Sequence, residues 1–251
     1  MQIANWITST QGKVLLPLLA LAAVLTPATT LAGGLTTFDN GYEGWVGPTG
    51  MGGITFIDTS GGNPAPSLRT QFVDFGITFH NSTNPDFVGD YTATPVVDIS
   101  VDTNTVALNY LGLPTPRDFI VELRDYDNPP AGYPWVSVWT SLGVLDENNP
   151  GWHTWGVTIE DTSAVALPDG WGGYGAEDPV TYEPVLPPDR TFTDVLAGVD
   201  EIALTTFVPG YFYSDSYYDV ALDNISVALT PEPTAGLLLL IGGLTCLSRR
   251  R

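Results

Sequence analysis

Aromatic side chains recur in the central part of the sequence in an arrangement that suits sugar binding. Trp135 and Trp139 are four residues apart in an alternating segment, so both point to the same side of a β-strand. Trp171 and Tyr174 follow in a stretch rich in Gly and Pro. Flat aromatic rings stack on the apolar faces of sugar rings, while nearby polar groups bind the hydroxyls. These four residues are therefore the candidate glycan-binding platform.

The same tryptophans admit a second interpretation. Residues 33–229 hold six tryptophans, and large aromatic rings also fill the core between two packed sheets. We assign Trp45 and Trp155 to the core. Trp135 and Trp139 belong either to the core or to a binding face, depending on which side of the sheet they occupy.

Catalytic patterns are missing from the sequence. His80 and His153 are the only histidines, and no H-E-x-x-H, G-x-S-x-G or phosphate-binding loop occurs. A glycosidase needs two carboxylates that flank the scissile bond. Glu122, Asp125 and Asp127 have that chemistry, but their order differs from the Glu-x-Asp-x-x-Glu motif of laminarinase-like sandwich glycosidases. We therefore expect no catalytic residues and no enzymatic activity.

The segment Asp125-Tyr126-Asp127-Asn128, which precedes two prolines, offers carboxylates to a cation. Runs of this composition more often form a solvated turn in which Asp side chains accept backbone N–H groups. Both interpretations stay open at this point.

Charge is distributed unevenly along the chain. Residues 33–229 contain 27 of the 28 acidic residues but only 4 of the 8 basic ones, a net charge of −23. Such a field repels phosphate backbones, so we expect no nucleic-acid partner. The field suits neutral glycans and attracts cations, and it also keeps an extracellular protein soluble. The only cysteine, Cys246, lies outside this segment, which excludes an internal disulfide or a thiolate site within it.

The pattern of residues 33–229 predicts short strands. The chain contains 27 Gly and 21 Pro, and no window of this segment carries a helical apolar stripe. We expect an all-β fold, namely a single jelly-roll-like antiparallel β-sandwich flanked by an N-terminal signal helix and a C-terminal hydrophobic sorting helix. A long ordered loop is expected at 168–194. The strand-like runs are 54–57, 96–101, 105–111, 119–124, 135–142, 155–159, 202–208 and 217–227.

The two ends of the central segment carry short motifs, FDNGYEGW at 38–45 and DVALDNISV at 219–227. They resemble the opening and closing strands of carbohydrate-binding-module-like jelly rolls. The resemblance implies that the first and last strands lie together and hold a structural Ca²⁺, with Asp39, Glu43 and Asp223 as the matching ligands. Such oxygen ligands are those that Ca²⁺ prefers. Alternatively, Asp39 and Asn40 form a turn and Asp223 lies at a strand end.

Residues 1–32 have the features of a signal peptide. Lys13 precedes an apolar stretch at 14–25, and Thr30-Leu31-Ala32 provides a cleavage site of the small-x-small kind. The alternative is a buried helix, because the apolar stretch is too short for a comfortable membrane span.

The last residues combine a Pro-Glu-Pro motif, an apolar run at 235–247 and a terminal basic cluster. This tail resembles the PEP-CTERM sorting domain of bacteria. The resemblance implies a membrane-embedded, exosortase-type sorting enzyme that cleaves near the Pro-Glu-Pro motif. Basic residues stay on the cytoplasmic side, which places the central segment outside; the alternative is an ordinary tail anchor. The residues of the sorting motif are Pro231, Glu232, Pro233, Arg249, Arg250 and Arg251.

Together these features predict a signal peptide at 1–32, a β-sandwich body at 33–229 and a sorting tail at 230–251. We expect an exported, non-enzymatic protein of the bacterial cell surface or extracellular matrix that associates with extracellular polysaccharide. Its expected partners are the export machinery, the sorting enzyme and, through the tail before processing, the membrane. The alternatives are a structural or adhesive matrix protein without a defined glycan ligand, and a polysaccharide-degrading enzyme.

Overall fold

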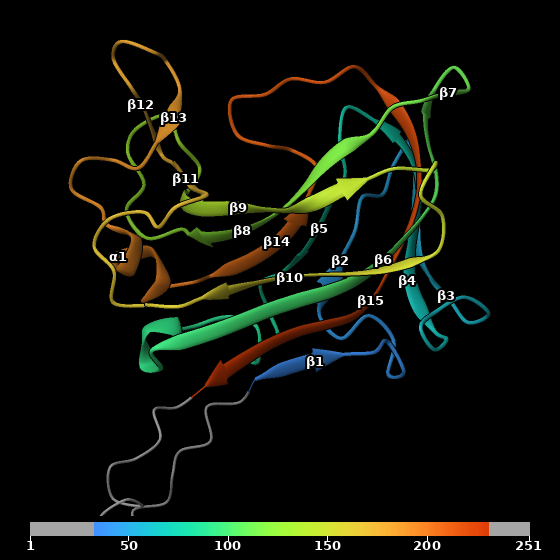
Figure 1. The fold of residues 1–251 in the computed structure, drawn as a ribbon, viewed down its shortest axis with the longest axis horizontal. Coiled ribbons are helices and arrows are strands. Elements are labelled where there is room, and N and C mark those ends of the chain that lie inside the picture. Colours follow the sequence, from blue (N-terminus) through green and yellow to red (C-terminus); the bar gives the residue numbers. More distant parts are fainter. Residues whose placement is uncertain (1–32, 231–251) are drawn as a thin grey trace, which may run out of the picture. The chain divides into compact units, whose positions relative to one another are not determined.

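The computed structural model describes residues 33–230, and every strand pair within this range is antiparallel (Figure 1). The prediction of an antiparallel all-β architecture is thus confirmed. The expected signal helix and sorting helix lie outside the described residues, as do the six residues of the sorting motif.

The larger sheet, here sheet A, has seven strands. Its main order is β10-β6-β15-β4-β3, with β1 also paired to β15 and β7 to β6. The long strand β15 therefore lies at its centre. The strands are β1 (Gly34–Thr36), β3 (Gly53–Asp58), β4 (Ser67–Asp74), β6 (Val96–Tyr110), β7 (Leu113–Pro114), β10 (Trp152–Ile159) and β15 (Ser216–Thr230).

The second sheet, sheet B, has six strands in the order β11-β9-β8-β14-β5-β2. The elements outside the two large sheets are the hairpin of β12 (Ala176–Glu177) and β13 (Pro184–Val185), the 3-10 turn η1 (Tyr91–Ala93) and the short helix α1 (Phe192–Leu196). Neither of these helices, nor any other among residues 33–230, has the length and apolarity needed to cross a membrane. The strands of sheet B are β2 (Trp45–Val46), β5 (Thr78–Asn81), β8 (Arg117–Asp125), β9 (Val136–Leu145), β11 (Trp171–Tyr174) and β14 (Glu201–Thr205).

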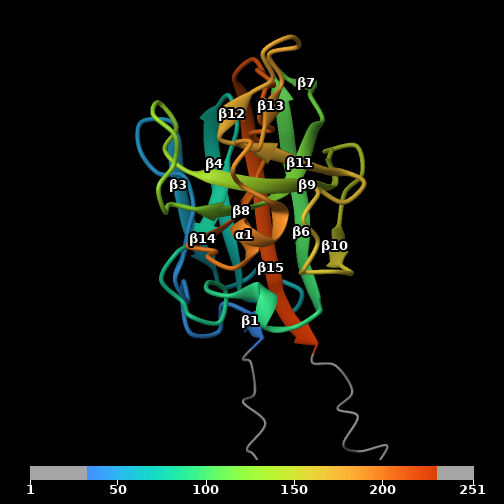
Figure 2. The same cartoon turned by 90° about the vertical axis from the view of Figure 1, so that its left-hand side faces the viewer.

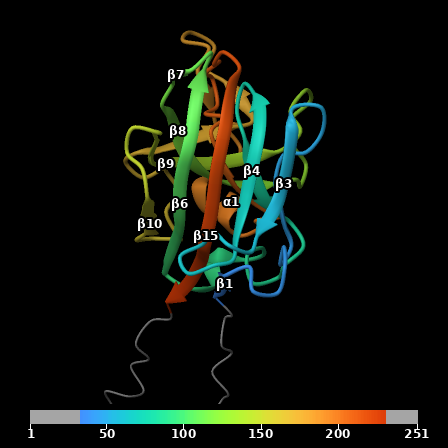
Figure 3. The same ribbon diagram turned by 90° about the vertical axis from the view of Figure 1, so that its right-hand side faces the viewer.

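The chain passes repeatedly from one sheet to the other, as expected for a jelly-roll-like sandwich. It moves from β4 to β5, back to β6, and again from β7 to β8 and from β14 to β15. Figures 2 and 3 show the strands of sheet B running across those of sheet A. The two sheets thus pack face to face with crossed strand directions, and one continuous core lies between them.

Alternation along the strands produces this core. Leu222 of β15 and Ile202 of β14 are fully buried in one cluster, together with the residues two positions away, Val220 and Leu204. Each fully buried apolar side chain stabilises the fold by about 1.5–3 kcal/mol. Of the two tryptophans assigned to the core, Trp45 is 1% exposed, and Trp155 packs against the core while partly exposed.

Two stretches differ from the sequence-based expectation. The runs at 96–101 and 105–111 form one strand, β6, because the residues expected to separate them, 102–104, pair regularly with residues 221–223 of β15. The expected loop at 168–194 contains β11, β12, β13 and the start of α1. It is ordered because β11 pairs with β9 and extends the edge of sheet B.

The outer face of sheet A is held together by Arg69 of β4. Its Nε and Nη2 donate to the two carboxylate oxygens of Asp219 on β15 at 2.6 and 2.8 Å, and its Nη1 donates to Asp58 on β3 at 3.0 Å. The side-chain and backbone hydrogen bonds from Ser60, followed by the one from Arg69, lower the pKa of Asp58 to about 2. The guanidinium group therefore connects three neighbouring strands.

We expect acid to remove the contribution that the hydrogen bonds of Asp58 make to the stability of the protein. The folded pKa of Asp58 lies below its unfolded value, so its contribution is complete above about pH 4 and disappears as the pH falls through about 2. Urea unfolding measured between pH 5 and pH 2 should show a shallower loss of stability in Asp58→Asn than in the wild type. Asp169→Asn, which changes an exposed aspartate elsewhere, is the control, and equal pH slopes in Asp58→Asn and the wild type would contradict this account.

Candidate functional site

An open cleft lies on the outer face of sheet B. Its volume is about 570 Å³, and its floor includes Thr78 and His80 of β5 and Glu122 and Arg124 of β8. These side chains point outward because their sequence neighbours point into the core. The floor is therefore a row of polar groups on neighbouring strands.

Glu122 is the most heavily hydrogen-bonded group of this row. One oxygen, Oε1, accepts from Trp135 Nε1 at 3.0 Å and from Ser137 Oγ at 2.6 Å. The other, Oε2, accepts from Arg124 Nε at 2.9 Å and from Arg124 Nη2 at 2.7 Å. The carboxylate is buried, so these four donors compensate for its loss of hydration.

The row continues across the sheet through Glu201 of β14. Arg124 Nη1 donates to Glu201 Oε1 at 2.5 Å, and His80 Nδ1 lies 2.8 Å from Glu201 Oε2. Although burial opposes ionisation of Glu201, the hydrogen bond from His80 and the charge of Arg124 lower the pKa of this carboxyl. The side chain of His80 is one-third exposed and is thus the end of the row nearest to solvent.

Aromatic rings form one wall of the cleft. The guanidinium of Arg124 lies 4.2 Å from the centre of the Trp135 ring, a distance typical of a cation–π contact. The rings of Trp135 and Tyr174 have their centres 6.0 Å apart. Burial, with a contribution from the charge of Glu122, raises the pKa of Tyr174, which keeps its hydroxyl protonated as a hydrogen-bond donor.

The structure separates the four predicted platform residues. Trp135 and Tyr174 line the cleft together. Trp139 is partly exposed, and its indole lies directly over Gly172 of β11, where any larger residue would clash with it. Trp171 points to the other side of β11, because its ring packs edge-on against Phe192 of α1 with centres 5.1 Å apart.

The sequence interpretation missed the polar row. It considered Glu122 only as a hypothetical glycosidase carboxylate and gave no role to Arg124, Glu201 or His80. The alternation of β8 places Glu122 and Arg124 on one face, a signal that could have been read from the sequence. Glu201 and His80 join them only through the pairing of β14 with β8 and β5.

The three predicted calcium ligands have different surroundings. Asp39 is exposed and accepts from Thr37 Oγ1 at 2.8 Å, and Glu43 accepts from the backbone of Asn40 at 3.2 Å. Asp223 is fully buried in sheet A. Within residues 33–230, these carboxylates do not form a group of three within 4.8 Å. Burial, with smaller contributions from the charges of Asp102 and Asp39, raises the pKa of Asp223. A calcium ion at these residues stays a prediction, and no step of the function is derived through it.

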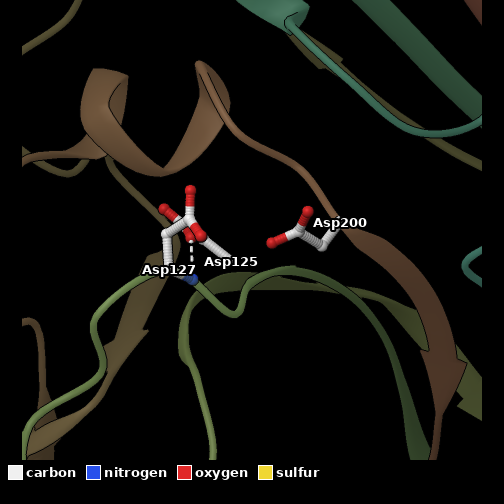
Figure 4. Close-up of side chains that lie close together, drawn as sticks. All are labelled: Asp125, Asp127 and Asp200. Atoms are coloured by element: carbon white, nitrogen blue, oxygen red, sulfur yellow. Dashed lines mark hydrogen bonds between the residues drawn. The ribbon is translucent and has the colours of Figure 1, made fainter.

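Another acidic group does come together, as Figure 4 shows. Carboxylate oxygens of Asp125, Asp127 and Asp200 lie within 4.8 Å of one another. Asp125 accepts from the backbone N–H of Asp127 at 2.7 Å, and it also forms an ion pair with Arg190. Asp200 accepts from the backbone of Tyr126 at 2.8 Å. The segment is thus an Asp-rich turn whose positive partner is an arginine.

Comparisons with known proteins found no matching family model and no matching curated protein. Among solved structures, the family 11 carbohydrate-binding module of a Clostridium thermocellum cellulosomal cellulase has a TM-score of 0.47 at 14% identity, over 80% of this chain and 97% of that one. An exo-β-agarase gives 0.46 at 15%, over 78% of this chain and 25% of the other.

A third match is a xylanase from Clostridium thermocellum that contains a family 22 carbohydrate-binding module, with a TM-score of 0.45 at 10% identity. It covers 78% of this chain and 28% of the xylanase, so the chain spans about a quarter of the length of this enzyme and of the agarase. At these scores, none of the three matches assigns a function to the cleft.

The hydrogen bonds between Glu122, Arg124 and Glu201 should contribute to the stability of the protein. Arg124→Met would leave Glu122 and Glu201 buried without their positive partner, and we expect it to lower the free energy of unfolding at pH 7 by about 3 kcal/mol. The deficit should shrink toward pH 4, because the stranded carboxylates of the variant can then take up protons. Urea denaturation measures both effects.

Arg124→Lys is the matched control for this experiment, since it keeps the charge but loses the planar fork of donors. It should fall between the wild type and Arg124→Met. Wild-type stability of Arg124→Met at pH 7 would show that the row does not hold the floor together.

The sequence-based calcium site is tested by a thermal melt. If the resemblance to carbohydrate-binding modules extends to the ion, calcium should raise the melting midpoint, and a chelator or Asp223→Asn should abolish the rise. An unchanged midpoint would remove calcium from the description of this protein.

Proposed function

We propose that this chain is an exported, non-enzymatic bacterial surface protein whose β-sandwich binds extracellular polysaccharide through the cleft on sheet B. The observation that carries the proposal is the combination of an aromatic wall, Trp135 and Tyr174, with a fixed polar floor, Glu122, Arg124 and His80. Aromatic faces favour the C–H faces of sugars, and fixed polar groups bind their hydroxyls.

The charge of the cleft favours a neutral ligand. Arg124 donates hydrogen bonds to both Glu122 and Glu201. Its positive charge is therefore already paired and is not available to bind a phosphate or carboxylate of a ligand. The body as a whole carries a net charge of −23, which repels polyanions. A neutral, hydroxyl-rich polymer meets neither obstacle.

The dimensions of the whole cleft favour a chain rather than a single sugar. The residues of its floor and aromatic wall come from β5, β8 and β11, and β14 and β9 lie between these strands. Strands are ~4.8 Å apart, so four intervals span about 19 Å. This length exceeds one sugar ring and matches a short stretch of a linear glycan.

The state of the carboxylates favours binding over hydrolysis. A general acid must release a proton and a nucleophile must offer a free oxygen. Glu122 already accepts four hydrogen bonds, and Glu201 is held by Arg124 and His80. Carboxylates bound in this way fix the side chains around them but are poorly placed to act as catalysts.

Export is the second part of the proposal. It is supported by the signal-peptide features of residues 1–32 and by the tail at 230–251, which resembles PEP-CTERM sorting domains. In this proposal a sorting enzyme of the exosortase type recognises the tail, which anchors the chain in the membrane until processing. The sandwich then lies outside the cell, where polysaccharide is its binding partner.

We expect Tyr174→Ala to weaken binding of the recognised glycan about tenfold, since loss of one stacking surface at the centre of a site exceeds about 1 kcal/mol. A panel of neutral polysaccharides identifies the glycan, and isothermal titration calorimetry with the full-length protein measures its affinity. Tyr110→Ala, which removes an exposed ring from the end of β6 in sheet A, should bind like the wild type.

Absence of binding to the whole panel, while the protein stays in the extracellular matrix, would replace this proposal with a purely structural role. Release of sugar products that Glu122→Gln abolishes would replace it with an enzyme.

A further inference from the structure

The loop between β14 and β15 exposes aromatic rings beside the cleft. Tyr211 is 68% exposed, Phe212 is 82% exposed and Phe207 is 43% exposed, which is uncommon for neighbouring rings on a soluble surface. Phe207 and Tyr211, with the intervening 208–210, line the same cleft as Trp135. The rings therefore border the proposed binding site.

The loop contacts two other segments of the chain. At its start, Phe207 lies against Gly76, just before β5, where a side chain on the glycine would clash with its ring. At Gly210, whose φ is +82°, the backbone approaches Pro184 of β13 so closely that only glycine fits. Figures 1 and 2 show the loop and the β12–β13 hairpin close together. Its path is thus fixed at two distant points.

Arg117 of β8 holds the end of the loop. This side chain is 6% exposed, and its Nη2 donates to Ser214 O at 3.2 Å and to Ser216 Oγ at 2.8 Å. Its Nη1 donates to the carbonyls of Thr115 and Pro116, each at 3.2 Å. The guanidinium lies 4.7 Å from the centre of the Tyr213 ring.

The partners of this arginine are unusual. Within the described range, all four of its hydrogen bonds go to carbonyl or hydroxyl oxygens and none goes to a carboxylate, in a body with 27 acidic residues. Burying a charge without an opposite charge is unfavourable. The arginine therefore has a role that a neutral core residue would not fulfil, and its contacts show what that is: it joins the start of β8 to the end of the loop.

We propose that the β14–β15 loop is a preorganised aromatic wall of the cleft, in which Tyr211 packs against a sugar ring of the ligand and Arg117 is the residue that positions the wall. This inference rests on the proposed glycan-binding function and extends it to the other side of the cleft. A loop fixed in advance loses less conformational entropy when the ligand binds. Arginine suits this task because its planar fork reaches several oxygens at once.

The contact with the ligand is tested by Tyr211→Ala in the full-length protein. The ring is mostly exposed, so its removal should leave the fold intact. Calorimetry with the glycan that the wild type selects should show about a tenfold loss of affinity. Tyr110→Ala again serves as the matched control and should bind normally. If Tyr211→Ala binds the glycan as tightly as the wild type while Tyr174→Ala binds it more weakly, Tyr211 does not contact the ligand. The proposed function would then still stand.

The positioning role of Arg117 is tested without any ligand. Hydrogen–deuterium exchange should be faster in residues 207–215 of Arg117→Met than in the wild type, while strands β9 and β15 stay protected. If this variant fails to fold, Ser216→Ala removes one of the four hydrogen bonds and should give a smaller effect of the same sign. Wild-type exchange of the loop in Arg117→Met, or in Ser216→Ala where that is the variant that folds, would overturn the positioning role.

The two tests also separate this inference from the function on which it rests. A wild type that binds no glycan would remove the proposed function and the role of Tyr211 together. The exchange experiment would still decide whether Arg117 fixes the loop.

Discussion

The structure depends on how four arginines are used in a body that is otherwise almost entirely acidic. Each one adds side-chain hydrogen bonds between strands, turns or loops of the sandwich. Arg69 connects three strands on the outside of sheet A, and Arg124 holds two carboxylates on the floor of the cleft. Arg190 pairs with Asp125 in the acidic turn, and Arg117 ties down the loop beside the cleft. Such a scarce charge is most effective where it is buried, because the low dielectric there strengthens its hydrogen bonds.

The cleft follows from this use of charge. Its central arginine donates hydrogen bonds to two buried carboxylates, and they in turn orient an indole, a hydroxyl and an imidazole. The result is a rigid polar surface whose members already have partners before a ligand arrives. Rigidity of this kind suits recognition, since little entropy is lost on binding, and it suits proton transfer by Glu122 and Glu201 poorly, since both already have partners. The aromatic rings on both sides add apolar surface to a site that would otherwise remain well hydrated.

Much of the fold could be predicted from the pattern of the sequence. The runs at 119–124 and 217–227 lie inside β8 and β15, and the run at 135–142 overlaps β9 from Val136 on, because alternation is a local property of a strand. The strands β4 and β5 were not identified, and two predicted runs proved to be one long strand, β6. The residues of the expected break, 102–104, pair with β15, more than 100 residues away, and this pairing keeps β6 continuous.

The sequence alone determined the charge of the body, the lack of thiols within it and the side of β8 on which Glu122 and Arg124 lie. All of these follow from composition or from the two-residue period of a strand. Only the tertiary structure decided that His80 and Glu201 complete the row, because their contact joins residues 121 positions apart. It also decided that Trp171 turns toward the core while Tyr174 faces the cleft. Strand partners and register are set by the packing of the whole sandwich, and a local pattern does not encode them.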